Sequence, residues 1–424
     1  MTRANRVPPP KFPSLGRRRN QMTAPLTGIH VLDLSWVMVG PASGRALADL
    51  GAEVIKVESS RRIDPVRTLG PFKDGKVGPE RSVSYHNLNA GKRCIALDIR
   101  KPQGRELVLR LSEWADVVLE SFTPGVLEEL KLAYRDLGVR NPKIIMASTA
   151  ILGQTGPDGK GTSGVGTMGA AMSGATYQFG WPDRPPSGPW GPWTDAVTPR
   201  FIVTSILAAL HQRSRTGKGC YLDLAQAECG IQFMMPAYYE FVANGRVPER
   251  RGSAGSPLAA PQGVYPCAGK DRWVAIDAAS PDRWTTLRNL IGGALGDTRF
   301  DTIVGRLRNR GDLDSAIAQW THPRESDAVE AELQAARIPA HVVSRGLDLA
   351  RDSDLRHIGH FVKIDDPVIG EVEIEGARAA FDRTPAAPTR RGPRIGEHTH
   401  EILREVCAMS EEEIARLSAD GILE

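Results

Sequence analysis

Short apolar runs alternate with amphipathic stretches through the first half of the chain. Four apolar runs rich in Val, Ile and Leu are predicted to be strands: 29–34, 53–57, 116–119 and 143–148. Between them, 41–50 and 101–114 have the spacing of amphipathic helices. This alternation predicts a parallel sheet with helices on both faces. Such sheets bind ligands beyond the carboxyl ends of their strands, so 35–40 and 58–67 are candidate binding loops.

The pattern changes at 153–199, where glycine and proline dominate. A long loop-rich stretch inside a compact chain is more often the wall of an active site than a linker. The next helix is predicted to begin with Thr198 as its cap and Pro199 in its first position. The polar, glycine-rich segment 244–260 indicates a boundary, and 401–417 predicts one terminal helix.

The composition is that of a globular chain of two or three domains, with 424 residues, 41% hydrophobic and 25% charged. A net charge of +4 permits steering of a small anion but does not indicate a nucleic-acid-binding protein. No apolar run approaches the roughly 20 residues that span a bilayer. Five scattered cysteines without a CxxC pair argue against disulfides and a metal site and favour the reducing cytoplasm.

The first 22 residues are rich in arginine and contain no acidic residue. Transit peptides share this composition. Four prolines between residues 8 and 13 would break the amphipathic helix that a transit peptide needs. We therefore predict a disordered basic tail for 1–22.

General catalytic signatures are absent: the chain contains no GxxxxGK[ST], HExxH or GxSxG motif, and no GxGxxG follows the first strand. The glycine-rich run 161–169 is not preceded by a strand, so it predicts a mobile wall rather than a nucleotide loop. The histidines show no metal-ligand spacing, and His398 is interpreted as structural.

A series of motifs in a fixed order resembles the class III CoA-transferases, the family of the formyl-CoA:oxalate and carnitine CoA-transferases and the α-methylacyl-CoA racemases. In chain order they are LTGIHVLDL (26–34), LGAEVIKVE (50–58), NAGKR (89–93), ADVVLESFTPG (115–125), ILAAL (206–210), GVY (263–265) and GEHT (396–399). Each motif alone is weak, but together they cover nearly the whole chain after the basic tail.

The resemblance implies an α/β fold. It implies a Rossmann-like, parallel-sheet large domain formed by both chain ends, a smaller inserted α+β domain, and a homodimer of interlocked subunits. We therefore expect the first part of a CoA-binding domain at 23–224, a linker helix and the small domain at 225–345, and a return to the large domain at 346–424.

The family's catalytic aspartate stands in a loop fifteen residues before the final leucine of ILAAL, and counting back from Leu210 leads to Asp195. The resemblance implies that this carboxylate attacks an acyl-CoA to give a mixed anhydride and then carries CoA as an aspartyl thioester. Without the resemblance, Asp195 would be read as a loop carboxylate or helix cap. The predicted partners are an acyl-CoA and a carboxylic acid, with succinyl-CoA as the candidate donor.

Positions that the resemblance places along CoA are Val37, Met38, Val39, Leu97, Arg100, Ser121 and Phe122. CoA carries three phosphate groups, and the candidate cations are Arg61, Arg62, Arg67, Lys92 and Arg93. The chain departs from the family at Ser121, where asparagine is common, at Glu129, where a basic residue is common, and at Met38, where the oxalate enzymes have glutamine. The acceptor acid therefore cannot be copied from those enzymes.

Tract 181–195 resembles the branch that acts on succinyl-CoA and aryl-substituted succinates. Trp190 and Trp193 in this tract, together with Trp36, are candidates for the wall of the acyl pocket, with lid packing as an equal alternative.

A racemase on the same fold is the main rival, but it needs a histidine and an aspartate on opposite faces of the α-carbon. The matching segment 163–173 contains neither. A non-catalytic scaffold subunit would lack the aspartate, which is present here. A nicotinamide dehydrogenase would need the glycine fingerprint that is missing.

Overall fold

Six apolar runs form one parallel sheet in the computed structural model, which describes residues 23–157, 159, 161–366, 369–384 and 386–424. The strands are β1 (His30–Asp33), β2 (Glu53–Glu58), β3 (Arg93–Ala96), β4 (Val117–Glu120), β5 (Ile145–Ala150) and β6 (Cys220–Ala225). Their order is β3-β2-β1-β4-β5-β6, the order of doubly wound sheets, and every pair is parallel. The predicted α/β class with a parallel sheet is confirmed. The predicted basic tail lies outside the described residues.

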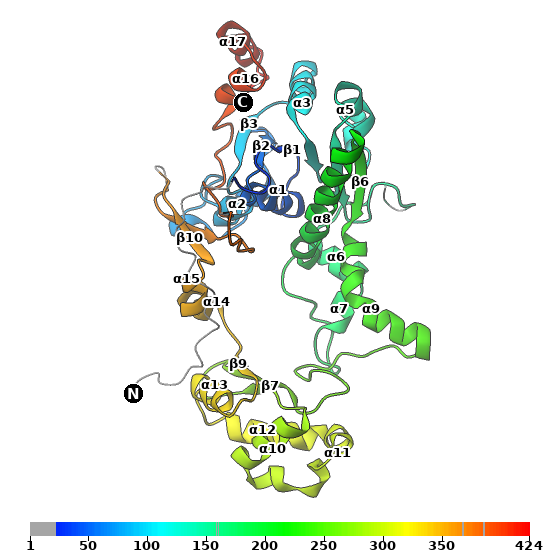
Figure 1. Ribbon diagram of the computed structural model, residues 1–424, viewed down its shortest axis with the longest axis vertical. Coiled ribbons are helices and arrows are strands. Elements are labelled where there is room, and N and C mark those ends of the chain that lie inside the picture. The colour runs from blue at the N-terminus through cyan, green and yellow to red at the C-terminus, as the bar shows by residue number, and fades with distance from the viewer. Residues whose placement is uncertain (1–22, 158, 160, 367–368, 385) are drawn as a thin grey trace. The chain divides into compact units, whose positions relative to one another are not determined.

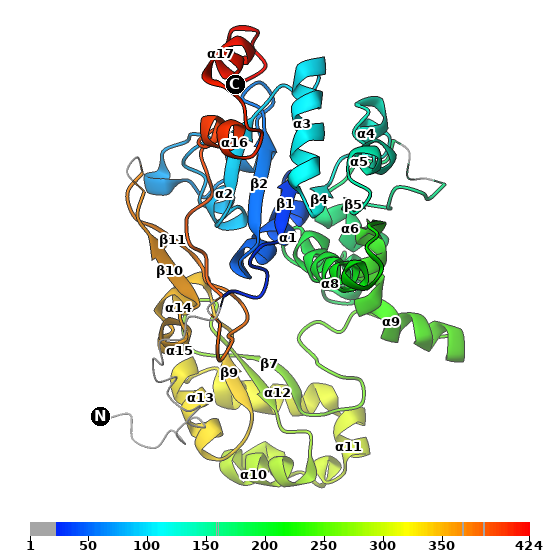
Figure 2. The same ribbon diagram turned by 45° about the horizontal axis from the view of Figure 1, so that its top comes forward.

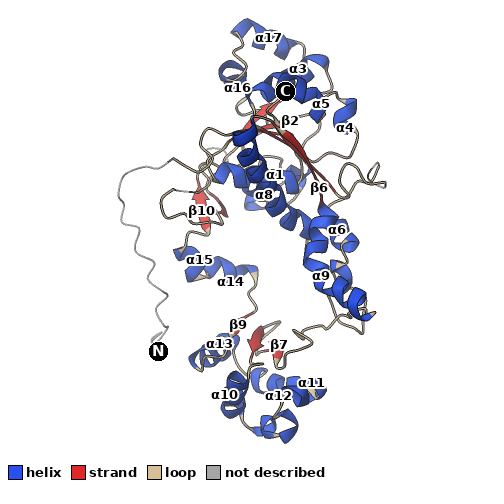
Figure 3. Ribbon diagram, turned by 45° about the vertical axis from the view of Figure 1, so that its right-hand side comes forward, coloured by secondary structure: helices blue, strands red, loops and turns tan. Residues whose placement is uncertain are grey.

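Helices cover both faces of the sheet because apolar side chains alternate along each strand. Leu32 and Leu34 belong to the core under one layer of helices, whereas Val31 belongs to the core under the other. The first layer contains α3 (Pro102–Trp114), α5 (Tyr134–Arg140), α16 (Thr399–Glu405) and α17 (Glu411–Ala419). The second contains α1 (Val39–Asp49) and α8 (Trp193–Thr216). Figure 3 shows the two layers on opposite sides of the strands.

Contacts divide the chain into two compact units (Figure 1). The larger contains the described residues up to 173, then 190–235 and 356–424, and the smaller contains 174–189 and 236–355. The linker helix and the small domain were expected together at 225–345, whereas the smaller unit comprises 174–189 and 236–355. Helix α9 (Gln226–Asn244) runs from one unit into the other.

The C-terminal segment completes the larger unit along the outer strand β3. Leu97 forms a bridge with Leu423, and the Asp98 N–H donates to the Ile422 carbonyl at 2.9 Å. The His398 N–H donates to the Cys94 carbonyl at 3.0 Å, so residues far apart in sequence share one core (Figure 2). This cover satisfies part of a strand edge that would otherwise be open.

The remaining elements of the larger unit are short. They are α2 (Val83–Leu88), α4 (Val126–Glu129), α6 (Gly166–Met172), α15 (Ser353–His357, which begins in the smaller unit), and the antiparallel strands β10 (Phe361–Ile364) and β11 (Val372–Glu375). No helix in the described part of the chain is both long and apolar enough to cross a membrane.

The smaller unit has its own core around a three-stranded antiparallel sheet. Its elements are α7 (Ala175–Gln178), β7 (Gln262–Pro266), β8 (Trp273–Asp277), α10 (Pro281–Ile291), α11 (Ile303–Arg308), α12 (Arg310–Thr321), α13 (Ser326–Ala335), β9 (Ala340–Val342) and α14 (Gly346–Arg351). Leu287, Ile317 and Val329 are fully buried in this core.

Two helix predictions were wrong. The helix expected from Thr198 begins five residues earlier at Trp193, with Pro199 inside it, because the first turn packs against α6 and tertiary packing overrides the local signal. The single helix expected at 401–417 is two helices. Ala408 adopts a positive φ of 49° between them, and Ser410 caps the second with its hydroxyl on the Glu413 N–H.

Candidate active site

Asp195 lies in the first turn of α8, and its side chain is buried, with the residue 4% exposed. Its carboxylate accepts hydrogen bonds from the backbone N–H of Gly166, the first residue of α6, and from the side chain of Gln226, the first residue of α9. The Thr194 hydroxyl lies 3.1 Å from Gln226 Oε1, which turns the amide nitrogen of Gln226 toward Asp195. Three elements therefore fix one carboxylate.

Glycines let α6 and α9 approach the Asp195 turn closely. A Cβ on Gly166 would stand 2.6 Å from the Pro192 carbonyl and 2.7 Å from the Asp195 nitrogen. A Cβ on Gly169 would stand 2.2 Å from the Thr194 hydroxyl oxygen. The run 161–169, predicted to be a mobile wall, thus ends in part of a helix that supports Asp195, which corrects that interpretation.

Burial raises the pKa of Asp195 to about 6, and the hydrogen bonds from Gly166 and Gln226 hold it from rising further. No charge on the described residues contributes to this shift, and none of their cations forms an ion pair with Asp195. At neutral pH the carboxylate is ionised, poorly hydrated and not neutralised by a cation. Such a group is suited to nucleophilic attack.

A cavity of about 420 Å³ opens at the carboxyl ends of β1, β2, β3 and β4, where the strand order reverses. It is lined by Leu34, Trp36, Val57, Glu58, Ser59, Arg61, Arg62, Leu97, Asp98, Ile99, Arg100, Phe122, Val126, Glu129 and Leu130. The structure thus brings together six residues predicted for the site: Trp36, Arg61, Arg62, Leu97, Arg100 and Phe122. Both candidate binding loops predicted from the sequence contribute to this lining.

Aromatic rings and guanidinium groups meet in this cavity. The Trp36 ring lies 5.7 Å from that of Phe122, and the Arg62 guanidinium lies 5.1 Å from the Trp36 ring centre. Ser121 Oγ accepts a hydrogen bond from the Trp36 N–H at 2.9 Å, which fixes the loop after β1. Such a lining can stack a planar ring and bind phosphate groups.

Three predicted cations do not line the cavity. Arg67 is fully buried, with its guanidinium 2.6 Å from Glu58 and 2.8 Å from Glu80, and these partners keep its pKa above its usual value despite burial. Lys92 is buried beside Asp33 at 2.7 Å, and Arg93 forms ion pairs with three glutamates. Each of these three cations therefore already pairs with a carboxylate of the protein itself.

Val37 and Met38 lie between β1 and α1, Val39 is the first residue of α1, and none of the three lines the cavity. Val37 has a positive φ of 66°, a costly conformation for a β-branched residue, and its N–H donates to Asp64 at 3.0 Å. The buried carboxylate of Asp64 therefore stabilises the strained conformation of this loop.

The three predicted tryptophans do not gather in one place. Trp36 belongs to the cavity, Trp190 is 99% exposed, and Trp193 packs edge-on against Phe233 with 5.8 Å between ring centres. Only Trp193 is close to Asp195, in the same turn of α8.

Sequence reasoning missed Gln226, Gly166 and Glu120. Burial raises the pKa of Glu120 to about 7, and this residue accepts hydrogen bonds from the Phe122 N–H at 2.8 Å and the Gln154 amide at 3.2 Å. One feature of the sequence could have indicated Glu120: it is a charged residue at the end of an apolar strand. For Gln226 and Gly166, nothing local in the sequence indicates a contact with Asp195.

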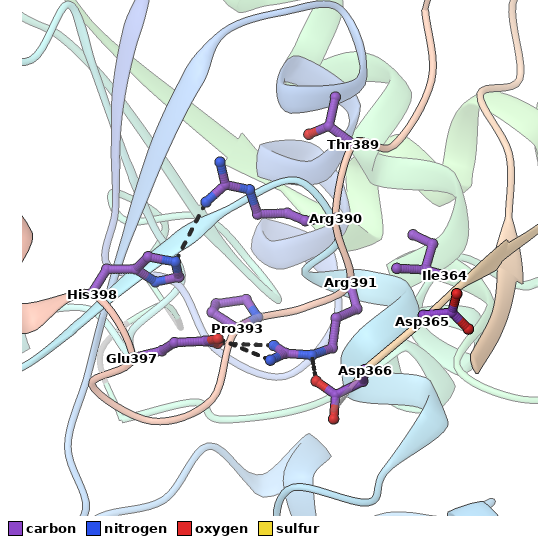
Figure 4. A pocket seen from close by; sticks show the side chains of 9 residues that line it. All are labelled: Ile364, Asp365, Asp366, Thr389, Arg390, Arg391, Pro393, Glu397 and His398. Atoms are coloured by element: carbon purple, nitrogen blue, oxygen red, sulfur yellow. Dashed lines mark hydrogen bonds and ion pairs between the residues drawn. The ribbon is translucent and has the colours of Figure 1, made fainter. Parts of the chain in front are cut away.

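A second cavity, of about 320 Å³, lies beside the GEHT motif (Figure 4). Arg391 bridges Asp366 and Glu397 there. His398 Nδ1 accepts the Cys94 N–H at 3.2 Å, so this histidine helps to hold the edge of β3. No group of His, Cys, Asp or Glu within the described ranges is arranged to hold a metal ion.

The doubly wound sheet and its cavity define an α/β protein with a candidate ligand site at the carboxyl edge of its strands. The chain matches the model of CoA-transferase family III over residues 26–399. It is 32% identical to the succinyl-CoA–D-citramalate CoA-transferase of Chloroflexus aurantiacus, covering 94% of this chain and 98% of that protein. It is 31% identical to the succinate–glutarate CoA-transferase of Agrobacterium fabrum, covering 90% and 96% respectively.

A solved CAIB/BAIF family protein from Brucella suis superposes with a TM-score of 0.82 at 32% identity, covering 91% of this chain and all of that one. The chain belongs to CoA-transferase family III. The predicted resemblance and enzyme class are therefore confirmed, and the family implies CoA thioesters and carboxylic acids as substrates.

Proposed function

We infer that this enzyme transfers CoA from an acyl-CoA to a carboxylic acid through covalent intermediates on Asp195. The observation that carries the proposal is the environment of this carboxylate, which is buried without a cation and oriented by Gly166 and Gln226. Several relatives are named for succinyl-CoA or succinate, which favours succinyl-CoA as the donor.

In the first half-reaction, an Asp195 oxygen attacks the thioester carbonyl, the C–S bond breaks, and CoA leaves as thiolate. The thiolate then attacks the Asp195 carbonyl of the mixed anhydride, and the donor acid leaves as carboxylate. The acceptor carboxylate attacks the carbonyl of the aspartyl-CoA thioester, the C–S bond breaks, and a second mixed anhydride forms between Asp195 and the acceptor. The released thiolate attacks the acceptor's carbonyl carbon in this anhydride, and Asp195 leaves as carboxylate. Asp195 is regenerated without net proton transfer. The Gly166 N–H and the side-chain amide of Gln226 are the donors available to the Asp195 oxygens as their charge changes.

CoA is proposed to occupy the cavity at the carboxyl edge of the sheet. Trp36 and Phe122 supply aromatic surface, and the phosphates are assigned to Arg61, Arg62 and Arg100. Arg61 contacts Asp98 at 3.5 Å and Glu424 at 3.1 Å, so two carboxylates orient its guanidinium, and its side chain is 59% exposed rather than buried as in Arg67 and Lys92. Arg67 is better explained as a structural support of the cavity wall at Glu58, because its donors already bind Glu58, Glu80 and the Pro393 carbonyl.

A cytoplasmic homodimer remains part of the proposal. Exposed aromatic and aliphatic residues follow one another in the last turns of α9, which is typical of a surface covered by another subunit. Their exposed fractions are 56% for Tyr238, 59% for Tyr239, 55% for Phe241 and 60% for Val242. Light scattering coupled to size-exclusion chromatography tests it, and a monomer at micromolar concentration would contradict it.

The decisive experiment is mass spectrometry of the protein after incubation with a panel of acyl-CoA donors headed by succinyl-CoA and aryl-acyl-CoA. We expect a CoA or acyl adduct on the peptide that contains Asp195, and no adduct on Asp195→Ala. Transfer by Asp195→Ala at the wild-type rate would overturn the mechanism. Deuterium exchange into a 2-methylacyl-CoA would instead support the racemase alternative, and activity only with a second, different subunit would support a paired assembly.

A further inference from the structure

The chain passes between the two units at four places. These are Ser173–Gly174, Pro189–Trp190, Met235–Pro236 and Leu355–Arg356. The first three adjoin the elements that hold Asp195: α6 ends at Met172, α8 begins at Trp193, and the third passage lies within α9, which begins with Gln226. These three passages are therefore the covalent links between the smaller unit and the elements that hold Asp195.

One arginine of the smaller unit fastens segment 174–189, which connects α6 to α8. Arg250 donates through Nε to the Trp181 carbonyl at 3.1 Å, through one terminal nitrogen to the Tyr177 carbonyl at 3.2 Å, and through the other to the Arg184 carbonyl at 3.2 Å. Its guanidinium also lies 5.2 Å from the Tyr177 ring centre. Only a guanidinium has the fork of donors for three such acceptors.

Backbone contacts bring the same segment close to the chain around Arg250. The Gly252 N–H donates to the Gly180 carbonyl at 2.9 Å, and the Gln178 amide donates to the Pro248 carbonyl at 3.3 Å. Gly252 has a φ of +59°, and a Cβ there would stand 2.6 Å from the Trp181 ring. Segment 174–189 is therefore seated directly on residues 248–252.

We propose that Arg250 is a positioning residue for Asp195, acting through segment 174–189. The segment follows α6, whose Gly166 N–H binds Asp195, and ends at Pro189, six residues before Asp195. By tying three carbonyls of the segment to one guanidinium, Arg250 fixes the chain that joins the donor Gly166 to the acceptor Asp195. The inference rests on the proposed role of Asp195 as the nucleophile.

The test compares Arg250→Gln and Arg250→Lys with Arg251→Gln, which removes a neighbouring exposed arginine whose side chain forms no hydrogen bond or ion pair with the described part of the chain. A small displacement of a reacting group costs about 10²-fold in rate. We expect kcat to fall roughly 10–100-fold in both Arg250 variants while KM for the acyl-CoA changes less than about threefold. The pH midpoint of kcat should rise as the hydrogen bonds to Asp195 loosen, and Arg251→Gln should behave as wild type.

A second readout needs no turnover. The full-length proteins are labelled with a water-soluble carbodiimide and glycinamide across a pH series, and modification of Asp195 is quantified by peptide mass spectrometry. We expect faster labelling, over a shifted pH range, in both Arg250 variants.

Unchanged kcat, pH midpoint and labelling in Arg250→Gln would overturn the inference, even if its melting temperature fell, since a purely structural role predicts that result. If the wild type transfers CoA from no donor, the proposed function fails, whereas the labelling comparison still decides the role of Arg250.

Discussion

Asp33 and Asp195 are both buried carboxylates of the larger unit, and their surroundings shift the pKa in opposite directions. Burial alone would raise the pKa of Asp33, but attraction by Lys92 and Lys56 outweighs burial and lowers it. Lys92 lies 2.7 Å from Asp33, and burial lowers the pKa of this lysine to about 8. Asp195 has only neutral hydrogen-bond donors, and burial raises its pKa to about 6.

The difference separates a charge compensated by lysines from one whose recognised partners are neutral donors. A carboxylate paired with one buried lysine and attracted by a second supports a fold, because Asp33 accepts the Ser35 N–H at 2.9 Å and Lys56 of β2 donates to the Ser35 carbonyl, which holds the loop after β1 against β2. A carboxylate without a cation keeps its electron pairs available for a substrate and remains costly to the fold. Both types of carboxylate lie in the larger unit.

Exchanging Asp195 for asparagine tests the reactive side of the comparison and has the largest expected effect. Asparagine keeps the shape but cannot form an anhydride, so kcat should fall by about 10⁴-fold or more. Initial rates with succinyl-CoA and a panel of acids measure it. If the purified variant retains a tenth of the wild-type kcat, the proposed role of Asp195 as the nucleophile is wrong.

Removing the compensating lysine should make Asp33 resemble Asp195. Lys92→Met leaves a fully buried carboxylate with one fewer cation, and we expect the free energy of unfolding to fall by about 3–5 kcal/mol. Urea denaturation measures this loss. Lys218→Met, at an exposed position of the same unit, is the control and should change it by less than about 0.5 kcal/mol.

Asp195 itself should destabilise the protein in a pH-dependent way. Its folded pKa lies above the unfolded value, so the folded state holds the proton more tightly and stability falls as pH rises from about 4 to about 6. Asp195→Asn removes this dependence. The variant should match wild type near pH 4 and exceed it by about 2–3 kcal/mol at pH 7.5. Equal stability of both proteins at pH 7.5 would show that Asp195 is better compensated than its contacts indicate.

Gln226 should determine the pH below which activity is lost. Its amide lowers the pKa of Asp195, so Gln226→Leu should move the acidic midpoint of kcat upward by about one pH unit, equivalent to about 1.4 kcal/mol. The wild-type midpoint should lie near 6, with activity rising as Asp195 ionises. A downward shift in Gln226→Leu would contradict the hydrogen bond from this amide.

The short strand β3 (Arg93–Ala96) was not predicted. Strands β1, β2, β4 and β5 could be predicted because each is an apolar run, a pattern that depends on neighbouring residues. The start of α8 could not, since Thr198 and Pro199 form a strong local start signal and the true start depends on packing against α6. The position of Asp195 followed from its spacing to ILAAL, but its pKa depends on Gly166 and Gln226, which only the fold brings near.

The predicted phosphate-binding arginines also show what the sequence alone cannot determine. The sequence alone does not distinguish Arg62, which faces the cavity, from Arg67, which is buried. What separates them is whether carboxylates distant in sequence, such as Glu80 for Arg67, are folded against them.

The interleaving of the two units also sets an order of events on the ribosome. Residues 236–355 form one continuous stretch, so most of the smaller unit can fold as soon as it leaves the exit tunnel. The larger unit must wait, because β3 stays uncovered until the segment after 356 is synthesised and Leu423 reaches Leu97. During that interval the apolar edge of a nascent parallel sheet is open to chaperones, and slowed translation between 236 and 355 should lengthen that exposure.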